Sequence, residues 1–378
     1  MQSSVTVIGA GIFGVSSALE LLDRGFDVTL VEQYDGLDLR TTSNAPSRNI
    51  RFSHGDDVWY TKSARKAKSL WKHLENRLSI DLMDECGFAW FAHTDDGWAS
   101  VSQLTLEAQG IPVERLDPTD GERLYPSFGY DDLSFILFEV DAGVLRAGKA
   151  VSALRKEFVD SGGKMRLGKA ERKGESVLIE GEIYNPDATI WCCGPWIPNL
   201  FDIPTDIKVT VQEVTFFNSS PEWDSPHVPA YSDAEDANNF YGVGGLEGFP
   251  FKLASDLRGV EFNPDLDQRE LNDKQLNLCK DYLSKRFPSL QNSSVFERRL
   301  CQYTSTGDSN WIIAPISDIS NQWIVGAGSG HGFKHGPALG IYVADLIEGK
   351  IKPDLKFAAN ERPFLTGGWQ MMENRLEL

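Results

Sequence analysis

The stretch Ser4-Val5-Thr6-Val7-Ile8-Gly9-Ala10-Gly11-Ile12-Phe13-Gly14 near the amino terminus decides the fold of this chain. It begins with β-branched and apolar residues that favour a strand, and its three glycines then end that strand. Apolar residues follow at helical spacing as far as Gly25, and the run 27–32 predicts a second strand. The order of strand, glycine turn, helix and strand predicts a βαβ unit, the start of a Rossmann-type α/β domain.

This unit predicts a dinucleotide site. The glycines let the chain turn tightly and let backbone approach a pyrophosphate, and the amino end of the following helix favours anions. An acid at the end of the second strand accepts hydrogen bonds from ribose hydroxyls and disfavours a 2′-phosphate. Glycines alone do not separate FAD from NAD. The predicted cofactor residues here are Gly9, Gly11, Ile12, Phe13, Gly14, Glu32 and Gln33.

Length, composition and net charge limit the domain organisation and the partners that the chain can have. A chain of 378 residues favours two closely joined domains, and 41% hydrophobic residues allow a large core. The 55 acidic and 37 basic residues give a net charge of −18, which repels nucleic acid and anionic lipid surfaces. We therefore expect neither a nucleic-acid nor a membrane partner.

Cysteine usage and apolar runs indicate a cytoplasmic protein. The five cysteines are odd in number and irregularly spaced, which favours neither a disulfide framework nor a metal site. The apolar stretch 5–22 carries an acid and lacks a basic residue ahead of it, so it is a poor signal peptide. No run of eighteen uninterrupted apolar residues is present to span a bilayer.

The rest of the chain predicts a second domain interleaved with the first. Helical patterns cover 57–80, 145–158 and 336–348, and strands at 187–192 and 322–326 are expected to extend the cofactor sheet. Alternating segments at 208–217 and 240–262, rich in aromatics and glycine, predict a largely antiparallel mixed sheet for the substrate. The predicted division is 1–86, 145–217 and 313–378 for the cofactor domain and 87–144 and 218–312 for the substrate domain.

Three further segments carry a family resemblance. They are Thr41-Thr42-Ser43-Asn44-Ala45-Pro46-Ser47-Arg48-Asn49-Ile50-Arg51, Arg299-Leu300-Cys301-Gln302-Tyr303-Thr304 and Gly328-Ser329-Gly330-His331-Gly332-Phe333-Lys334. In this order they resemble the monomeric sarcosine oxidase and N-methyltryptophan oxidase family of FAD-dependent amine oxidases, within the D-amino acid oxidase superfamily. The resemblance runs from about residue 4 to 350.

The resemblance implies a role for each matching residue. Cys301 matches the cysteine that joins FAD through sulfur, so it implies covalent flavin. Implied catalytic residues are Arg48, Lys252 and Tyr303; implied substrate contacts are Arg51, Lys334, Tyr241, Asn44 and Asp256; implied cofactor contacts are Ser43, Arg48, Cys301, Gly328, Gly330, His331, Gly332, Phe333 and Lys334. Asn44 and Asp256 stand where relatives often have histidine, and Ala45-Pro46 replaces a Gly-Asp pair. These departures bear on the substrate more than on the flavin.

The same residues suit the implied chemistry physically. A guanidinium at Arg51 grips a carboxylate with paired hydrogen bonds, and the Lys334 ammonium neutralises the remaining charge. Cations near a flavin stabilise the negative charge that collects on the ring, and Lys252 is a point charge for developing superoxide. Burial close to such cations favours the neutral amine that hydride loss requires. Arg298 and Arg299 stand beside Cys301 and favour its thiolate wherever they point toward it.

The resulting hypothesis is oxidation of the C–N bond of a small amino acid, with a primary, N-methyl or cyclic amine. Hydride passes to FAD, O2 is reduced to hydrogen peroxide, and the imine is hydrolysed or remains cyclic. The expected partners are a small-molecule amine and O2, and the expected assembly is a monomer or homodimer. Three alternatives stay open: a flavin-dependent dehydrogenase or monooxygenase of tailoring metabolism acting on a larger amine or a protein side chain, a non-catalytic flavoprotein partner, and a nicotinamide dehydrogenase.

Overall fold

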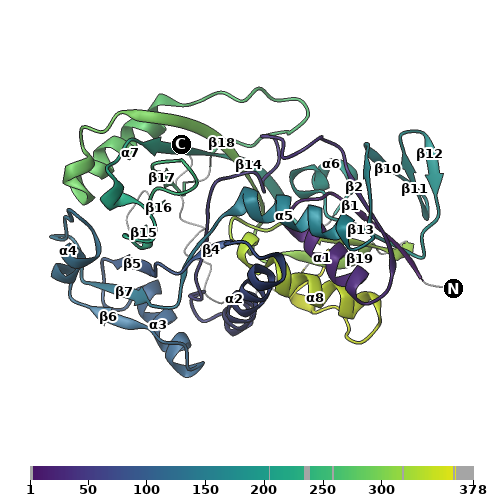
Figure 1. The fold of residues 1–378 in the computed structure, drawn as a ribbon, viewed down its shortest axis with the longest axis horizontal. Coiled ribbons are helices and arrows are strands. Elements are labelled where there is room, and N and C mark those ends of the chain that lie inside the picture. The colour runs from purple at the N-terminus through teal and green to yellow at the C-terminus, as the bar shows by residue number, and fades with distance from the viewer. Residues whose placement is uncertain are drawn as a thin grey trace.

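The structure is a computed structural model that describes residues 3–203, 205–233, 239–257, 259–316, 319–360 and 362, without the side chains of 319 and 320. Two large sheets dominate it, one on each side of the molecule in Figure 1. The last part of the predicted cofactor domain, residues 361 and 363–378, lies outside the described residues. No described helix combines the length and the apolar character that crossing a lipid bilayer requires.

The first sheet contains the predicted βαβ unit. Its strands run parallel except for the edge strand β19, which pairs antiparallel with β20. The strands predicted at 187–192 and 322–326 both belong to it, and the Rossmann-type prediction is confirmed. In sheet order the strands are β19 (Ile312–Ile316), β20 (Ile319–Gly326), β13 (Ala188–Trp191), β1 (Ser4–Ile8), β2 (Asp27–Glu32) and β9 (Lys164–Leu167).

Helices pack around this sheet as the periodic patterns predicted. Helix α1 (Ile12–Asp23) packs against α8 (Gly336–Ile347) and α5 (Ala147–Asp160), and α2 (Val58–Leu78) packs against α8. Trp71 of α2 is fully buried, and its indole Nε1 donates a hydrogen bond of 2.8 Å to the Lys334 backbone oxygen. Burying a side chain of this size stabilises the fold by at least about 1.5–3 kcal/mol. The same contact fixes the backbone of a predicted site residue.

The second sheet is largely antiparallel, as predicted for the substrate domain. Among its described strands, only β15 and β5 pair in parallel. The segment 208–217 forms β14 within this sheet, although the predicted division placed 145–217 with the cofactor domain, and 240–262 forms two strands. In sheet order the strands are β18 (Val295–Thr306), β14 (Ile207–Phe217), β17 (Phe251–Ser255), β16 (Phe240–Val243), β15 (Ala230–Asp233), β5 (Phe88–Ala92), β7 (Phe135–Glu139) and β6 (Glu114–Leu116).

Smaller elements complete the described structure. Two three-stranded sheets lie apart from the large ones, one of β3, β8 and β4 and one of β10, β11 and β12. The remaining strands are β3 (Arg48–Ile50), β4 (Met83–Asp84), β8 (Gly143–Leu145), β10 (Ala170–Lys173), β11 (Ser176–Ile179) and β12 (Glu182–Tyr184), and the remaining helices are α3 (Trp98–Ala108), α4 (Gly121–Leu124), α6 (Ile197–Leu200) and α7 (Asp273–Arg286).

The long strand β18 reaches from the second sheet toward the first. It pairs with β14 along nearly its whole length, with Gln212 opposite Cys301 and Thr210 opposite Tyr303. Figure 1 shows β18 and β14 extending from the region of α7 to the region of β1 and α1. The segment that the resemblance singles out therefore lies where the two sheets approach each other.

Candidate active site

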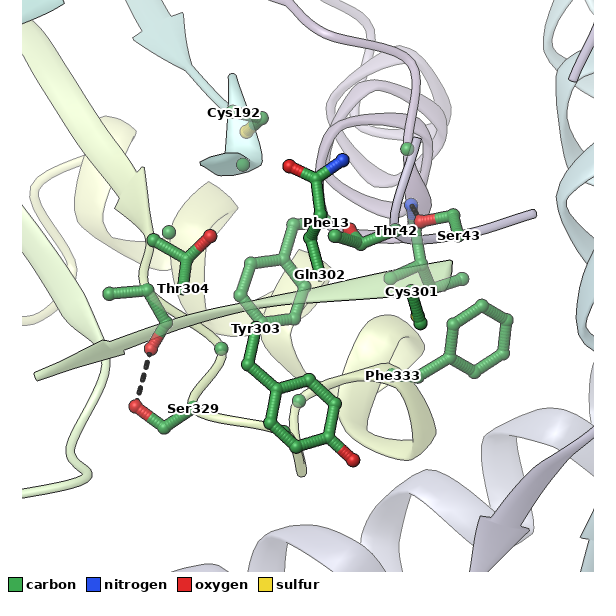
Figure 2. Close-up of a pocket in the computed structure, with 18 of the residues that line it drawn as sticks. Phe13, Thr42, Ser43, Cys192, Cys301, Gln302, Tyr303, Thr304, Ser329 and Phe333 are labelled. Atoms are coloured by element: carbon green, nitrogen blue, oxygen red, sulfur yellow. Dashed lines mark hydrogen bonds between the residues drawn. The ribbon is translucent and has the colours of Figure 1, made fainter. Parts of the chain in front are cut away.

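A cavity of about 120 Å³ lies at the carboxyl ends of β1, β13 and β20 and along β18. Open α/β sheets bind ligands at this end of their strands. Figure 2 shows β18 crossing the cavity, with Gln302 and Tyr303 directed to opposite sides. The lining residues are Gly11, Ile12, Phe13, Thr42, Ser43, Arg48, Cys192, Gly194, Cys301, Gln302, Tyr303, Thr304, Val325, Gly326, Ala327, Gly328, Ser329, Gly330, Gly332 and Phe333.

Ten of the predicted cofactor residues line this cavity and six do not. The six outside it are Gly9, Gly14, Glu32, Gln33, His331 and Lys334. Several lining residues, including Cys192 and Gly194 just after β13, were missed in the sequence. Their position directly after a buried strand of the cofactor sheet was the sequence feature that could have predicted them as cofactor contacts.

The glycine turn is held by close backbone contact. Gly9 has a φ of +97°, and a Cβ there would lie 2.5 Å from the Cys192 backbone oxygen. The Ile12 backbone N–H donates a hydrogen bond of 3.1 Å to Ser43 Oγ, which ties the start of α1 to the next loop. The turn therefore tolerates no side chain at Gly9.

Replacing Gly9 by alanine is expected to destabilise the protein by about 2–4 kcal/mol, because a positive φ and a clash with backbone act together. Thermal unfolding should show a melting temperature several degrees lower and a reduced FAD content. Gly25→Ala is the matched control, since Gly25 also has positive φ but a Cβ there meets no atom within 4 Å. Equal losses in both variants would contradict the close-contact explanation.

Glu32 contacts the glycine turn, and it pairs with Arg155, which was not predicted from the sequence. Its carboxylate accepts hydrogen bonds from the Ala10 and Gln33 backbone N–H groups at 2.9 and 3.0 Å. Arg155 of α5 approaches Glu32 at 3.3 Å and donates to the Ala10 backbone oxygen at 2.8 Å. Burial lowers the pKa of Arg155, and the charge of Glu32 opposes that shift. Glu32 and Arg155 together therefore stabilise the backbone of the glycine turn.

Arg48 is the cation that faces the Cys301 thiol. Its Nη2 lies 3.3 Å from Sγ and also donates to the Thr42 backbone oxygen at 2.9 Å. Arg298 and Arg299, the sequence neighbours considered for this role, form ion pairs with Glu213 and Glu297 instead. The charge expected beside Cys301 is thus present, but it comes from β3.

Arg51, which is partly buried, and Lys334, which is buried, form a second basic group. The Arg51 guanidinium lies 4.9 Å from the centre of the Trp90 ring and donates to the Ser53 backbone oxygen. Lys334 is 3% exposed, and its Nζ donates to the His331 backbone oxygen at 3.2 Å. Burial lowers the pKa of Arg51 to about 10, and burial with the Arg51 charge lowers that of Lys334 well below its ordinary value. An incoming carboxylate would relieve both effects.

Lys252 on β17 is buried, which settles whether this lysine lies at the surface. Its Nζ lies 3.3 Å from the Ser47 backbone oxygen and 5.5 Å from the centre of the Tyr241 ring. Burial, with the charge of Arg48, lowers its pKa to about 7. A second cavity of about 260 Å³ reaches this lysine, and its lining also includes Asn44, Arg48 and Cys301.

Two tyrosines of the second sheet approach each other, and one of them, Tyr303, lines the first cavity. The hydroxyls of Tyr303 on β18 and Tyr241 on β16 lie 3.4 Å apart. Burial raises the pKa of both, and the charge of Asp256 adds to that shift. Asn44, in contrast, donates its side-chain amide to the Leu37 backbone oxygen. Of the two replaced histidine positions, the carboxylate at Asp256 is the one that acts on the tyrosines.

His331 packs in a buried aromatic cluster behind Lys334. Its Nε2 lies 3.1 Å from the Ser309 backbone oxygen, and its ring packs against the rings of His54 and His335. One ring nitrogen from each of the three histidines lies within 4.8 Å of the others. Burial and the Lys334 charge lower all three pKa values well below normal. Because Lys334 and Arg51 disfavour another positive charge here, we assign no metal to the cluster.

Comparison with known proteins shows a match over nearly the whole chain. Residues 4–346 match the family described as FAD dependent oxidoreductase. The chain is 26% identical to monomeric sarcosine oxidase of Bacillus sp. (strain B-0618), over 96% of each protein. It is 22% identical to N-methyl-L-tryptophan oxidase of Yersinia pestis (strain Pestoides F), over 93% of this chain and 97% of that protein.

Solved structures share the fold. L-proline dehydrogenase from P. horikoshii superimposes with a TM-score of 0.80 and 21% identity, over 93% of this chain and 94% of that one. At this identity the likeness concerns the arrangement of helices and strands. It confirms the predicted combination of a Rossmann-type sheet with a second, largely antiparallel sheet.

Proposed function

We propose that this chain, which belongs to the family of FAD-dependent oxidoreductases, oxidises the C–N bond of a small amino acid and passes the electrons to O2. The observation that carries the proposal is the pair of Arg51 and Lys334, basic groups that suit a substrate carboxylate. When bound, FAD supplies a two-electron acceptor for the hydride that leaves the carbon next to nitrogen. O2 becomes hydrogen peroxide, and water converts the imine to a carbonyl compound and an amine.

The cavity residues fit FAD. Glycines at 11, 328, 330 and 332 leave room for a flat ring and a pyrophosphate, and a Cβ at Gly330 would lie 2.9 Å from the Tyr303 ring. The amino end of α1 and Ser43 would hold the phosphates, and Glu32 would bind the ribose. Arg48 supplies positive charge on the side that carries Cys301.

The chain's own groups then prepare the substrate. Arg51 and Lys334 bind the carboxylate, and Tyr241 and Tyr303 form a wall that orients the carbon bearing nitrogen. Burial close to these cations disfavours an ammonium ion, so the substrate nitrogen is held as the neutral amine. Lys252 carries a proton near Ser47 and provides positive charge for the reduction of O2. Asn44 and Asp256 complete the proposed substrate contacts.

We further propose covalent attachment of FAD through Cys301, supported by the 3.3 Å contact of its sulfur with Arg48. Cys301 also lines the cavity that would hold the flavin. After acid precipitation of the purified protein, the yellow colour is expected to remain in the pellet. In Cys301→Ser the colour should pass to the supernatant.

Cys279→Ser is the matched control, because Cys279 is a buried cysteine in α7, away from the cavity. It should retain its flavin in the pellet. Colour released from the unaltered protein would contradict the covalent link and leave FAD binding intact. A colourless protein would contradict the oxidase proposal as a whole.

The remaining proposals concern location and assembly. All five cysteines are unpaired, which supports the cytoplasm, a reducing compartment, as the location. We propose a monomer or homodimer, which light scattering of the purified protein would test. We retain the division into a cofactor domain and a substrate domain as a proposal, with β14 placed by its sheet in the substrate domain.

A further inference from the structure

We propose that Glu139 is a positioning residue that fixes the Arg51 guanidinium for the substrate carboxylate. The inference rests on the proposed function, because it assigns a purpose to the orientation of Arg51. Glu139 is the last residue of β7, which is separated from β16 by β15 and β5, and it is fully buried. No family segment in the sequence includes it.

The hydrogen bonds of Glu139 converge on one short segment and one ring. Oε2 accepts from the Phe52 backbone N–H at 2.6 Å and from that of Ser53 at 3.2 Å. Oε1 accepts from Trp90 Nε1 at 3.2 Å and from the Ser53 hydroxyl. None of the ion pairs among the described residues includes Glu139. A buried carboxylate that forms no direct ion pair is costly unless it is hydrogen-bonded, and these four neutral donors satisfy its oxygens.

Those donors belong to two of the groups that lie against Arg51. The Ser53 backbone oxygen accepts a hydrogen bond from Arg51 Nη1, and the Trp90 ring lies 4.9 Å from the guanidinium carbon. Trp90 Nε1 also donates to Ser53 Oγ at 2.6 Å, which links the two groups directly. Glu139 therefore fixes two of the groups, Ser53 and Trp90, that position the guanidinium.

The negative charge of Glu139 also supports the binding role of Arg51 and Lys334. It opposes the effect of burial on the pKa of Arg51 and of Lys334, so it helps to keep both cations protonated. The carboxylate does not reach the cavity, because its oxygens are directed at residues 52, 53 and 90. Glu139 thus acts on the substrate only through Arg51 and Lys334.

The experiment measures binding of propionate, a simple carboxylate probe, to the FAD-containing protein by calorimetry. Glu139→Gln removes the charge and replaces one acceptor oxygen with an NH2 group, which cannot accept a hydrogen bond. Trp90→Phe keeps an aromatic ring beside Arg51 and removes the Nε1 donor. We expect the propionate Kd to rise about 10-fold or more in the first variant and about 3-fold in the second, because small misplacements of a binding group are costly.

Glu213→Gln is the matched control. Glu213 is a buried glutamate of the same sheet, on β14, and it bonds Arg298 and the Asn272 backbone N–H instead. It should leave the propionate Kd unchanged even where it lowers the melting temperature. A rise of the same size in Glu213→Gln would show a general structural effect and overturn the proposal.

Two other results are decisive. A wild-type Kd in both Glu139→Gln and Trp90→Phe would overturn the inference while leaving carboxylate binding at Arg51 intact. If Glu139→Gln does not fold, Trp90→Phe alone decides between the two outcomes. Failure of the unaltered protein to bind propionate, or an unchanged Kd in Arg51→Met, would instead refute the proposed function, and the inference would fall with it.

Discussion

Replacing Arg51 by methionine is expected to lower kcat/KM for the amino-acid substrate by about 10²- to 10³-fold. The guanidinium offers paired, charge-assisted hydrogen bonds to a buried carboxylate, and removing one partner of such a pair costs about 3–5 kcal/mol. The loss should appear mainly in KM, because the carboxylate is bound before and during the reaction. Peroxide formation is the measurement, with the best substrate from a screen of N-methyl, cyclic and primary amino acids.

Two comparisons make this result specific. Arg51→Lys should fall between the wild type and Arg51→Met, because it retains a charge without the planar fork. Arg115→Met is the matched control: Arg115 also lies over an aromatic ring of the second sheet, that of Phe135, but its side chain is 35% exposed. If Arg51→Met lost as much activity on a decarboxylated amine as on the amino acid, carboxylate binding would not be the role of Arg51.

Replacing Lys252 by methionine is expected to slow the reaction of the reduced protein with O2 by about 10²- to 10³-fold, because one preorganised charge toward a developing anion contributes about that much. Reduction of the protein by the amino acid under anaerobic conditions should change far less. Stopped-flow absorbance measures both rates. Lys208→Met is the control, since Lys208 is an exposed lysine of β14 that pairs with Glu261.

The same lysine predicts the pH dependence of the O2 reaction. Burial lowers the pKa of Lys252 to about 7, so the ammonium predominates below that pH and the neutral amine above it. The wild-type rate should therefore fall as pH rises through about 7, and Lys252→Met should lack this step. An unaltered rate in Lys252→Met would argue against the assigned role and favour the alternative of a dehydrogenase with another electron acceptor.

The part of the fold that the sequence predicts best is local. The glycine turn and the strands around it are encoded within 32 residues, and their pattern needs no partner from elsewhere in the chain. The long helices were likewise recognised from one buried face. The domain boundary at β14 was harder to predict from the sequence, because β14 joins the second sheet only through its pairing with β17 and β18.

The candidate site shows the same limit. Arg48 and Cys301 were singled out separately, but their contact joins residues 253 positions apart. The sequence instead offered the adjacent arginines 298 and 299, which form ion pairs with Glu213 and Glu297. Glu139 and Arg155 carry no motif at all, since their partners lie 49 or more positions away. The roles of such residues, which contact the site residues from behind, can be recognised only from tertiary contacts.

The strand β18 constrains how this enzyme can be redesigned. Cys301 and Tyr303 lie two residues apart on it, and its pairing with β14 fixes both in one register. An insertion or deletion in β18 would turn each side chain to the opposite face of the sheet. Libraries that aim at new substrates should therefore leave β18 untouched and vary Tyr241 and Asp256, which belong to shorter segments. Diversity among descendants of this scaffold is expected to concentrate at those positions.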